Sequence, residues 1–311
     1  MLCWGELGHR SRRVVCSLIG ITLAEFEQLH SVFFATITTQ KAPTWSKVDP
    51  SERRRKSGAG PKPRHDTQHM LFFILLYFRI YPTQDVLGFL FGGSQSWACR
   101  WVHRLTPILN ESLAKLGKLP LPPKADRIST IEELLRQYPD LAFIIDATER
   151  PTRRPKNEID QKEKYSGKKK RHTIKNTIVS DVRTSRICII GKTFGGSVHD
   201  KKMLDDDPIV FPEKSVLYQD TGYQGSHSPG VSEIRQPRKK ERNKERTEED
   251  KILNRGISHI RVRVEHAICG LKRSHIVSDI YRNRKSGFDN LTMHTAGGLH
   301  NFRTDMRSSA F

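Results

Sequence analysis

The sequence predicts an α/β domain built on a mixed sheet, preceded by an all-α region. Before Pro120 the apolar residues recur with helical spacing, and after about residue 140 they gather in short runs typical of strands. Three predicted strands precede a predicted helix, and a fourth follows it. Three antiparallel strands, then a parallel strand reached by a helical crossover, is the order of an RNase H-like sheet flanked by helices.

The all-α region begins with a helical segment over residues 1–45, where Thr22 caps a predicted second helix. Residues 46–65 are basic, rich in glycine and proline and nearly free of apolar side chains, which predicts a linker. A solvated loop and a segment that contacts phosphates are both consistent with this composition.

Residues 66–110 predict three helices. Asp66 or Thr67 caps the first, Thr83 caps a short second helix, and Ser94 caps the third after a glycine turn. Helix, short helix, glycine turn and helix form the pattern of a helix-turn-helix, although a purely structural helical domain has the same pattern. In the DNA-binding interpretation the third helix enters the major groove. Its polar residues there are Gln95, Ser96, Arg100 and Arg104.

Residues 125–311 predict the sheet domain. A connecting helix precedes a strand over 141–146, and a hairpin turn at 181–185 joins the next two strands. A helix begins near Asp200, and a fourth strand covers 215–220. Residues 226–254 form a charged insertion without a core-forming stripe, which predicts either an exposed segment or one that contacts DNA. A long helix follows this insertion.

The chain has a formal net charge of +20, with 54 Lys and Arg against 34 Asp and Glu. Such an excess predicts attraction to a polyanion, and nucleic acid fits better than a membrane surface. No apolar run approaches the roughly 20 residues that span a bilayer. The five cysteines form no C-x-x-C pair, so a zinc knuckle is not expected. We expect them to be reduced thiols in a cytoplasm.

Three carboxylates stand out as a candidate metal site. Asp146 and Asp220 each end an apolar run, and Glu265 lies in the long helix. At about 100° per residue, Arg261, Glu265 and Lys272 share one polar edge beside the apolar stripe of that helix. Carboxylate oxygens suit Mg²⁺ or Mn²⁺. An ordinary salt bridge between Arg261 and Glu265 is the alternative, since the two residues are four apart.

Five motifs in order resemble the DDE transposases of bacterial insertion sequences, in the branch related to Harbinger-type nucleases. The motifs are Asp146-Ala-Thr-Glu-Arg-Pro151, Tyr165-Ser-Gly-Lys-Lys-Lys-Arg-His-Thr-Ile-Lys-Asn176, Gly196-Ser-Val-His-Asp200, Asp220-Thr-Gly-Tyr-Gln-Gly225 and Arg261-x₃-Glu265-x₆-Lys272. Two positions depart from the family pattern. Ala147 stands where glycine is frequent, and Ser258 stands where tyrosine is common, so no role is carried onto Ser258.

The resemblance implies that Asp146, Asp220 and Glu265 bind two Mg²⁺ (or Mn²⁺) ions. These would activate water and later a 3′-hydroxyl, and would stabilise the leaving oxygen. It further implies double-stranded DNA as partner, both the terminal inverted repeats and the target, a homodimer on DNA, and a nucleoid-associated place in a bacterial cytoplasm. The residues expected to hold DNA phosphates are Lys168, Lys169, Lys170, Arg171, Lys175, Arg261 and Lys272.

Other acidic and aromatic residues lie near these motifs. Asp200 is most simply a helix N-cap, and Asp205 to Asp207 predict a solvated helix end. Glu149 points to the other strand face from Asp146, and the sequence leaves its role open, like those of His172, His199 and Tyr223. The predicted function is a transposase that cuts and joins DNA. The alternatives are a metal-dependent endonuclease without strand transfer and a domesticated helix-turn-helix DNA-binding protein.

Overall fold

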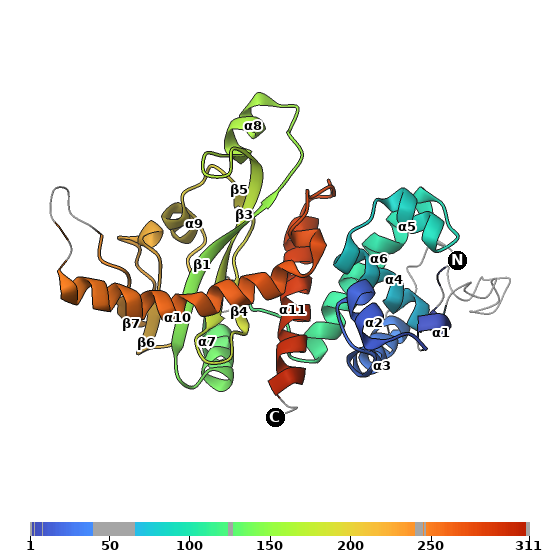
Figure 1. The fold of residues 1–311 in the computed structure, drawn as a ribbon, viewed down its shortest axis with the longest axis horizontal. Coiled ribbons are helices and arrows are strands. Elements are labelled where there is room, and N and C mark those ends of the chain that lie inside the picture. Colours follow the sequence, from blue (N-terminus) through green and yellow to red (C-terminus); the bar gives the residue numbers. More distant parts are fainter. Residues whose placement is uncertain are drawn as a thin grey trace, which may run out of the picture. The chain divides into compact units, whose positions relative to one another are not determined.

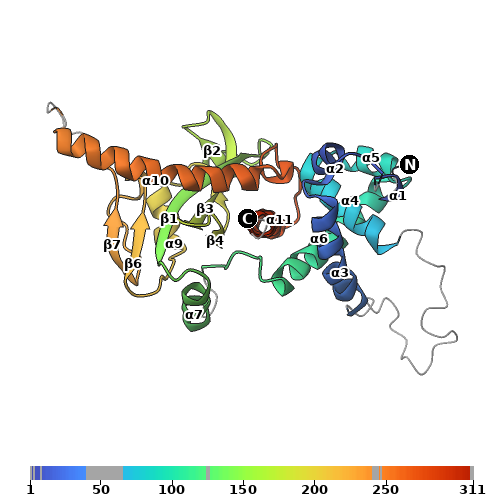
Figure 2. The same ribbon diagram turned by 60° about the horizontal axis from the view of Figure 1, so that its bottom comes forward.

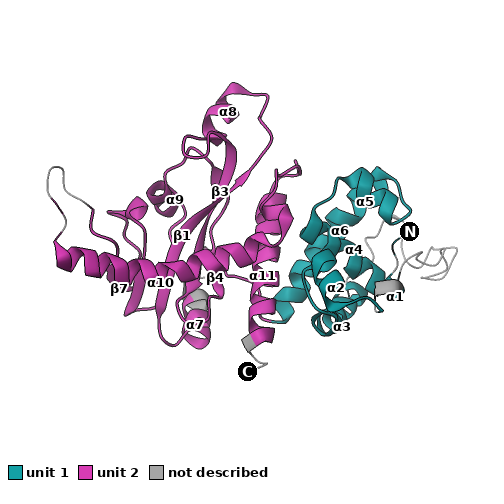
Figure 3. Ribbon diagram, in the orientation of Figure 1, with its two compact units in different colours: residues 1–116 teal, residues 117–311 magenta. Residues whose placement is uncertain are grey.

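The computed structural model describes residues 2, 4–7, 9–39, 66–123, 127–239, 245 and 247–308. The chain forms two compact units, a helical unit over Met1–Leu116 and a sheet unit over Gly117–Phe311 (Figure 3). The predicted linker 46–65 lies outside the described residues.

The helical unit packs around an almost wholly buried helix. Its helices are α1 (Trp4–Leu7), α2 (Arg12–Ile19), α3 (Leu23–Thr39), α4 (Thr67–Ile80), α5 (Gln84–Leu90) and α6 (Gln95–Lys115). Ten consecutive residues of α4, from His69 to Phe78, are buried, so α4 forms the centre of the unit. Such a helix must be covered on all sides, because apolar side chains lie on every face of it.

Side-chain caps begin the helices where the sequence predicts them. The side chains of Asp66, Thr83 and Ser94 accept hydrogen bonds from the third residue after each, which starts α4, α5 and α6. Before α3, the Thr22 amide donates to Glu25 Oε2 at 2.6 Å and the Glu25 amide donates to Thr22 Oγ1 at 3.3 Å, which is a capping box. Each cap satisfies amides that the first turn of a helix leaves without partners.

The sheet unit contains one curved mixed sheet between layers of helices (Figures 1 and 2). Its strands are β1 (Ala142–Pro151), β2 (Tyr165–Ser166), β3 (Arg171–Asp181), β4 (Ile187–Ile190), β5 (Phe194–Gly195), β6 (Ser215–Tyr218) and β7 (Val231–Arg235). Its helices are α7 (Arg127–Gln137), α8 (Glu158–Lys164), α9 (Asp200–Asp206), α10 (Glu248–Lys272) and α11 (Phe288–Ser308), with short 3₁₀ turns η2 (Thr221–Tyr223) and η3 (His275–Val277).

The strand pairing confirms the predicted fold class. Strand β3 pairs antiparallel with β1 and with β4, and β1 pairs in parallel with β6 after the crossover through α9. This is the RNase H-like arrangement of a mixed sheet with flanking helices.

Alternation along β1 places its apolar side chains in two different cores. Phe143 and Ile145 pack in a cluster with Leu134 of α7 and Leu204 of α9. Ile144 lies on the opposite face, against Ile257 and Val264 of α10. Figure 2 shows α10 across one side of the sheet and α7 on the other. Even-numbered residues of β1 therefore face α10.

Strand β1 is longer than predicted, and the charged segment contains regular structure that was not predicted. Strand β1 continues five residues past Asp146 to Pro151, and it stays paired with β3 throughout. The charged segment 226–254 contains β7, which pairs in parallel with β6, and the start of α10. Strand β7 lies at the sheet edge with mostly exposed residues, so its sequence shows no alternation of apolar and polar side chains.

Helix α11 carries a buried histidine that makes stability depend on pH. Burial lowers the pKa of His300 to about 4, although the Ser185 carbonyl, 3.0 Å from its Nε2, opposes the shift. In the unfolded state this imidazole has a pKa near 6.5, so between pH 6.5 and pH 4 it is protonated there but not in the folded state. The folded state is therefore destabilised as pH decreases from about 6.5 toward 4.

We expect His300 to lower the free energy of unfolding by about 2 kcal/mol when the pH decreases from 7 to 5, because its pKa differs between the folded and unfolded states. Urea unfolding of wild type and His300→Gln at both pH values measures this contribution. The variant keeps a polar side chain but cannot titrate, so its loss of stability in acid should be smaller by that amount. Equal losses in the two proteins would show that His300 does not control the acid response.

Candidate active site

Two aspartates lie side by side where strands β1 and β6 separate. Ile144 is in register with Tyr218 in the parallel pair, so Asp146 and Asp220 occupy matching positions two residues farther along. Parallel neighbours are about 4.8 Å apart. Both residues follow Ile144 and Tyr218 on the face that α10 covers. The sheet thus presents two carboxylates toward the helix that carries Glu265.

Local hydrogen bonds orient the two aspartates. Asp146 Oδ1 accepts from the Ala147 amide at 2.8 Å. Asp220 caps the turn η2, where its Oδ1 accepts from the Thr221 amide at 2.6 Å. In each residue, Oδ1 has a local amide donor. Asp220 thus begins the 3₁₀ turn that follows β6.

The two aspartates differ in electrostatics. Burial raises the pKa of Asp146, and the nearby Asp220 raises it further, while Arg261 and the Ala147 amide oppose the shift. Asp220 is about half exposed, and its Oδ2 lies 3.5 Å from Arg261 Nη2. A half-buried carboxylate beside another one is unfavourable unless cations compensate it. The site therefore favours a cation at Asp146.

Helix α10 brings two cations near this pair of aspartates. Arg261 reaches Asp220, and Asp146 acts on the pKa of Lys272 through its charge. The pKa of Lys272 is lowered mainly by burial and next by the Lys169 ammonium. Glu265 lies one turn after Arg261 and is exposed. The alternative salt bridge between Arg261 and Glu265 does not occur among the described ion pairs, since Arg261 pairs with Asp220.

The carboxylate pair fits a hard divalent cation, whereas the third ligand is not in place. Within the described parts of the chain, no three His, Cys, Asp or Glu side chains lie close enough together to hold a metal ion. Asp146 and Asp220 supply oxygen ligands of the chemistry that Mg²⁺ prefers, at a position where electrostatics favours a cation. Glu265 lies on the same helix as Arg261, and its side chain is exposed.

Behind this pair, three charged residues form a network that the sequence did not predict. Lys175 Nζ lies 3.0 Å from Asp200 Oδ1 and 3.6 Å from Glu149 Oε1, and its side chain is 12% exposed. Thr173 donates to Glu149 at 2.8 Å. The predicted N-cap role of Asp200 is wrong, since His199 caps α9 with its ring. The partners lie far apart in the sequence, so no spacing signal identifies them.

Among the residues expected to contact DNA, Lys175 is the one that this network binds. Its ammonium is bound to two carboxylates and to the Val198 carbonyl, which leaves little of it for a phosphate. Lys168, Lys169 and Lys170 are exposed in the turn between β2 and β3, and Arg171 is exposed at the start of β3. This turn lies near the active site, because the Lys169 charge lowers the pKa of Lys272.

Tyr223 and Asp205 to Asp207 lie outside the carboxylate pair. Tyr223 is fully buried in the core on the α9 side, and burial raises the pKa of its phenol well above the usual value, with Asp200 and Asp146 adding to the effect. Asp205 and Asp206 pair with Lys201 and Lys202 within α9. These two residues form helix salt bridges, which agrees with a solvated helix end. Asp207 departs from this prediction, because it is buried and its Oδ2 accepts from the Lys192 amide at 2.9 Å.

In the helical unit, the expected groove residues share one exposed surface of α6. Gln95, Ser96, Arg100 and Arg104 are all exposed. Ser96, Arg100 and Arg104 are four residues apart, so they project from one side of the helix. Arg104 lies 5.1 Å from the ring centre of Trp101, which holds the guanidinium near the helix surface.

Comparisons with known proteins agree with both units. A family model described as the DDE superfamily endonuclease matches residues 145–301, and one described as the helix-turn-helix of that superfamily matches residues 66–115. The chain is 31% identical over 260 residues to the "Probable transposase for insertion sequence element IS702" of Microchaete diplosiphon, covering 83% of this chain and 88% of that protein. No solved structure matches it.

These matches establish the class that the motifs predict. The endonuclease match contains Asp146, Asp220 and Glu265, and the helix-turn-helix match contains α4, α5 and α6. The family implies that the enzyme depends on divalent metal ions and acts on DNA. The chain belongs to the DDE superfamily endonucleases, as a DDE transposase of insertion sequences with a helix-turn-helix before its nuclease domain.

Proposed function

We propose that the chain cuts the ends of an insertion sequence and joins the resulting 3′-hydroxyls to target DNA. The adjacent Asp146 and Asp220 support this proposal, because they face the helix that carries Glu265 and electrostatics favours a cation between them. Asp146, Asp220 and Glu265 would hold two Mg²⁺ or Mn²⁺ ions. When bound, such ions lower the pKa of a water nucleophile and stabilise a leaving oxygen at phosphorus.

The residues around the carboxylates hold the DNA in this proposal. Arg261 compensates Asp220 in the free protein and would turn to a phosphate once a cation takes over that role. Lys272 is partly buried and supplies a positive charge near Asp146. The exposed turn Lys168–Arg171 would hold the backbone of the strand being cut. Lys175 positions Glu149 and Asp200 and does not bind DNA itself.

The helix-turn-helix would recognise the element ends in this proposal. The exposed side of α6 would enter the major groove of a terminal repeat, with Arg100 and Arg104 as its cations. Two ends must be brought together for joining, so we propose a homodimer on DNA, at the nucleoid of a bacterial cytoplasm. The described helices include none that is long and apolar enough to cross a membrane.

A joining assay tests this function. The protein, Mg²⁺, a target plasmid and labelled DNA from the flanks of its own reading frame should give nicked ends and then joined products. Removal of the metal by a chelator should abolish both products but leave most DNA binding, because Arg100, Arg104 and the basic turn need no metal. Cuts without joined products would indicate an endonuclease that does not transfer strands, and binding without cuts would indicate a DNA-binding protein without nuclease activity.

A further inference from the structure

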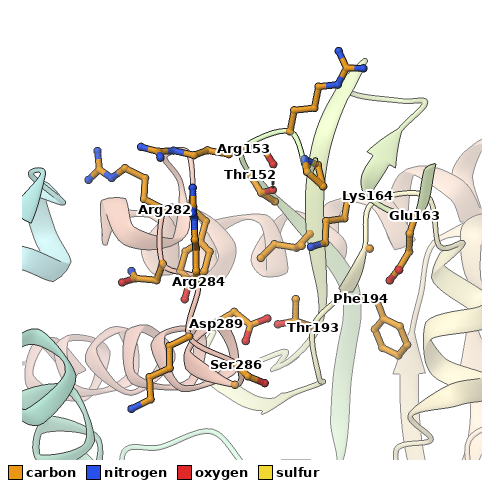
Figure 4. Close-up of a pocket in the computed structure, with 18 of the residues that line it drawn as sticks. Thr152, Arg153, Glu163, Lys164, Thr193, Phe194, Arg282, Arg284, Ser286 and Asp289 are labelled. Carbon is orange, nitrogen blue, oxygen red and sulfur yellow. Dashed lines mark hydrogen bonds between the residues drawn. The ribbon is translucent and has the colours of Figure 1, made fainter. Parts of the chain in front are cut away.

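A strongly basic pocket lies at the far end of β1 from α7. It has a volume of about 500 Å³, and seven of its lining residues are arginine or lysine while two are acidic. The segment after β1 and the end of α8 form one wall, and the segment between η3 and α11 forms another. Figure 4 shows Arg282 and Arg284 on one side of this pocket, with Lys164 and Glu163 on the other. We call it the flank pocket.

Backbone hydrogen bonds fix both sides of the flank pocket to the sheet. The Tyr281 amide donates to the Pro151 carbonyl at 2.8 Å, and the Thr152 amide donates to the His172 carbonyl at 2.9 Å. The Ser197 amide donates to the Glu163 carbonyl at 3.0 Å, so the end of α8 is held against the segment after β5. Because its walls are anchored in this way, the pocket is part of the folded sheet unit.

The floor of the flank pocket is held by a buried arginine. Arg150 is fully buried, and its Nη2 donates to the Asp289 carbonyl at 2.8 Å in the first turn of α11. Its guanidinium lies 4.8 Å from the ring centre of Tyr281. Arg150 thus joins β1 to the segment that forms the opposite wall. Its charge also adds to the positive potential of the pocket.

The two walls expose cations that the fold does not use. Arg153 and Lys156 are exposed on the β1 side, and Arg284 and Lys285 are exposed on the other. None of these four takes part in an ion pair with another described residue. Seven cations line this pocket of about 500 Å³ against two carboxylates, so the cations that are left uncompensated repel one another, and a polyanion would relieve this repulsion. One phosphate would leave most of this volume empty.

The distance to the carboxylates relates the flank pocket to DNA. Thr152 lies six residues after Asp146, directly past the end of β1, which corresponds to about 20 Å at about 3.3 Å per residue. At about 3.4 Å per nucleotide along one strand, this span equals about six nucleotides. A DNA backbone with one phosphate at Asp146 therefore reaches the pocket about six nucleotides away.

We propose that the flank pocket binds the backbone of double-stranded DNA about six base pairs from the phosphate that is cut. This inference rests on the proposed function for the position of the cut. The site is separate from the carboxylate pair and from the helix-turn-helix. If DNA binds in the flank pocket, the affinity for DNA depends on the length of duplex beside the cleavage position. Binding at the other two sites does not require this length.

A length series tests the flank pocket. Binding of the full chain to uncut element-end duplexes is measured by fluorescence anisotropy, with a chelator present and with 3, 6, 10 or 15 base pairs beyond the cut on either side. We expect Arg284→Gln/Lys285→Gln to weaken binding about tenfold on long duplexes and to lower the salt slope by about 2. The effect should vanish when the flank on one side is shorter than about six base pairs.

A matched variant controls for net charge. Arg136→Gln/Arg183→Gln also removes two exposed cations, but these lie near the opposite end of β1 and pair with Glu133 and Asp140. It should bind all duplexes nearly as wild type does. Equal losses in both variants, or a loss that is the same for every duplex length, would overturn the proposal. Failure of the proposed function would appear separately, as a wild type that does not cut DNA in Mg²⁺.

Discussion

Asp146→Asn is expected to lose DNA cleavage by a factor on the order of 10³ or more while the protein stays folded and binds DNA. The amide keeps the shape of the side chain but cannot ligate a divalent cation as a carboxylate does. Asp146 is the more buried of the two adjacent aspartates, so exposed carboxylates cannot easily replace it. Cleavage of labelled end DNA in Mg²⁺ measures the loss.

The same substitution should leave the melting temperature unchanged or raise it. The pKa of Asp146 is raised by burial and by Asp220, so the ionised group is less stable in the folded state than in water. At neutral pH the folded protein bears this cost, and asparagine removes it. A large fall in melting temperature together with lost activity would mean that Asp146 supports the fold, which would contradict its assignment as a ligand.

Asp205→Asn is the matched control. Asp205 is also an aspartate of the sheet unit, but it pairs with Lys201 in an exposed helix salt bridge. Such a pair contributes little to stability. Full activity in this variant and none in Asp146→Asn would separate the carboxylate pair from the acidic residues nearby. Residual cleavage above about one tenth of wild type in Asp146→Asn would contradict the proposed mechanism.

The sequence predicts those parts of the molecule that depend on local signals. Caps at Asp66, Thr83 and Ser94 start helices because a side chain bonds to an amide only three residues away. The apolar stripe of α10 is similarly local, and Ile257, Val264, Ala267 and Leu271 are all buried as predicted. Strand order follows from the general rules of chain connection.

Structural features that depend on residues distant in the sequence are not predicted. Strand β7 exists because β6 offers it an edge, and its own side chains show no apolar pattern. Strand β1 continues past Asp146 because β3 pairs with it, although polar residues follow. Lys175 looks like a phosphate contact within a basic run, yet α9 places Asp200 beside it. In each case the structure depends on contacts between residues that are far apart in the sequence, so local sequence patterns cannot predict it.

Gly230→Ala is expected to destabilise the sheet unit by about 3 kcal/mol, because it combines backbone strain with a clash. Gly230 has a φ of 86°, which favours glycine. A methyl group there would lie 1.9 Å from the Phe211 carbonyl oxygen, and this oxygen belongs to the backbone. The Gly230 carbonyl also accepts from the Ser215 amide at 3.3 Å, where β6 begins. The strain would therefore act on the strand that precedes Asp220.

Gly117→Ala separates the two causes. Gly117 has a φ of 65°, but no heavy atom lies within 4 Å of the position where its methyl group would be. Its substitution should cost only the backbone term of about 1 kcal/mol. Urea unfolding of both variants gives the difference, which we assign to the clash. We also expect Gly230→Ala to melt roughly 6 to 12 °C below wild type. If the two alanine variants unfold alike, the chain around Phe211 moves aside at little cost, and the start of β6 does not depend on the close approach of Gly230.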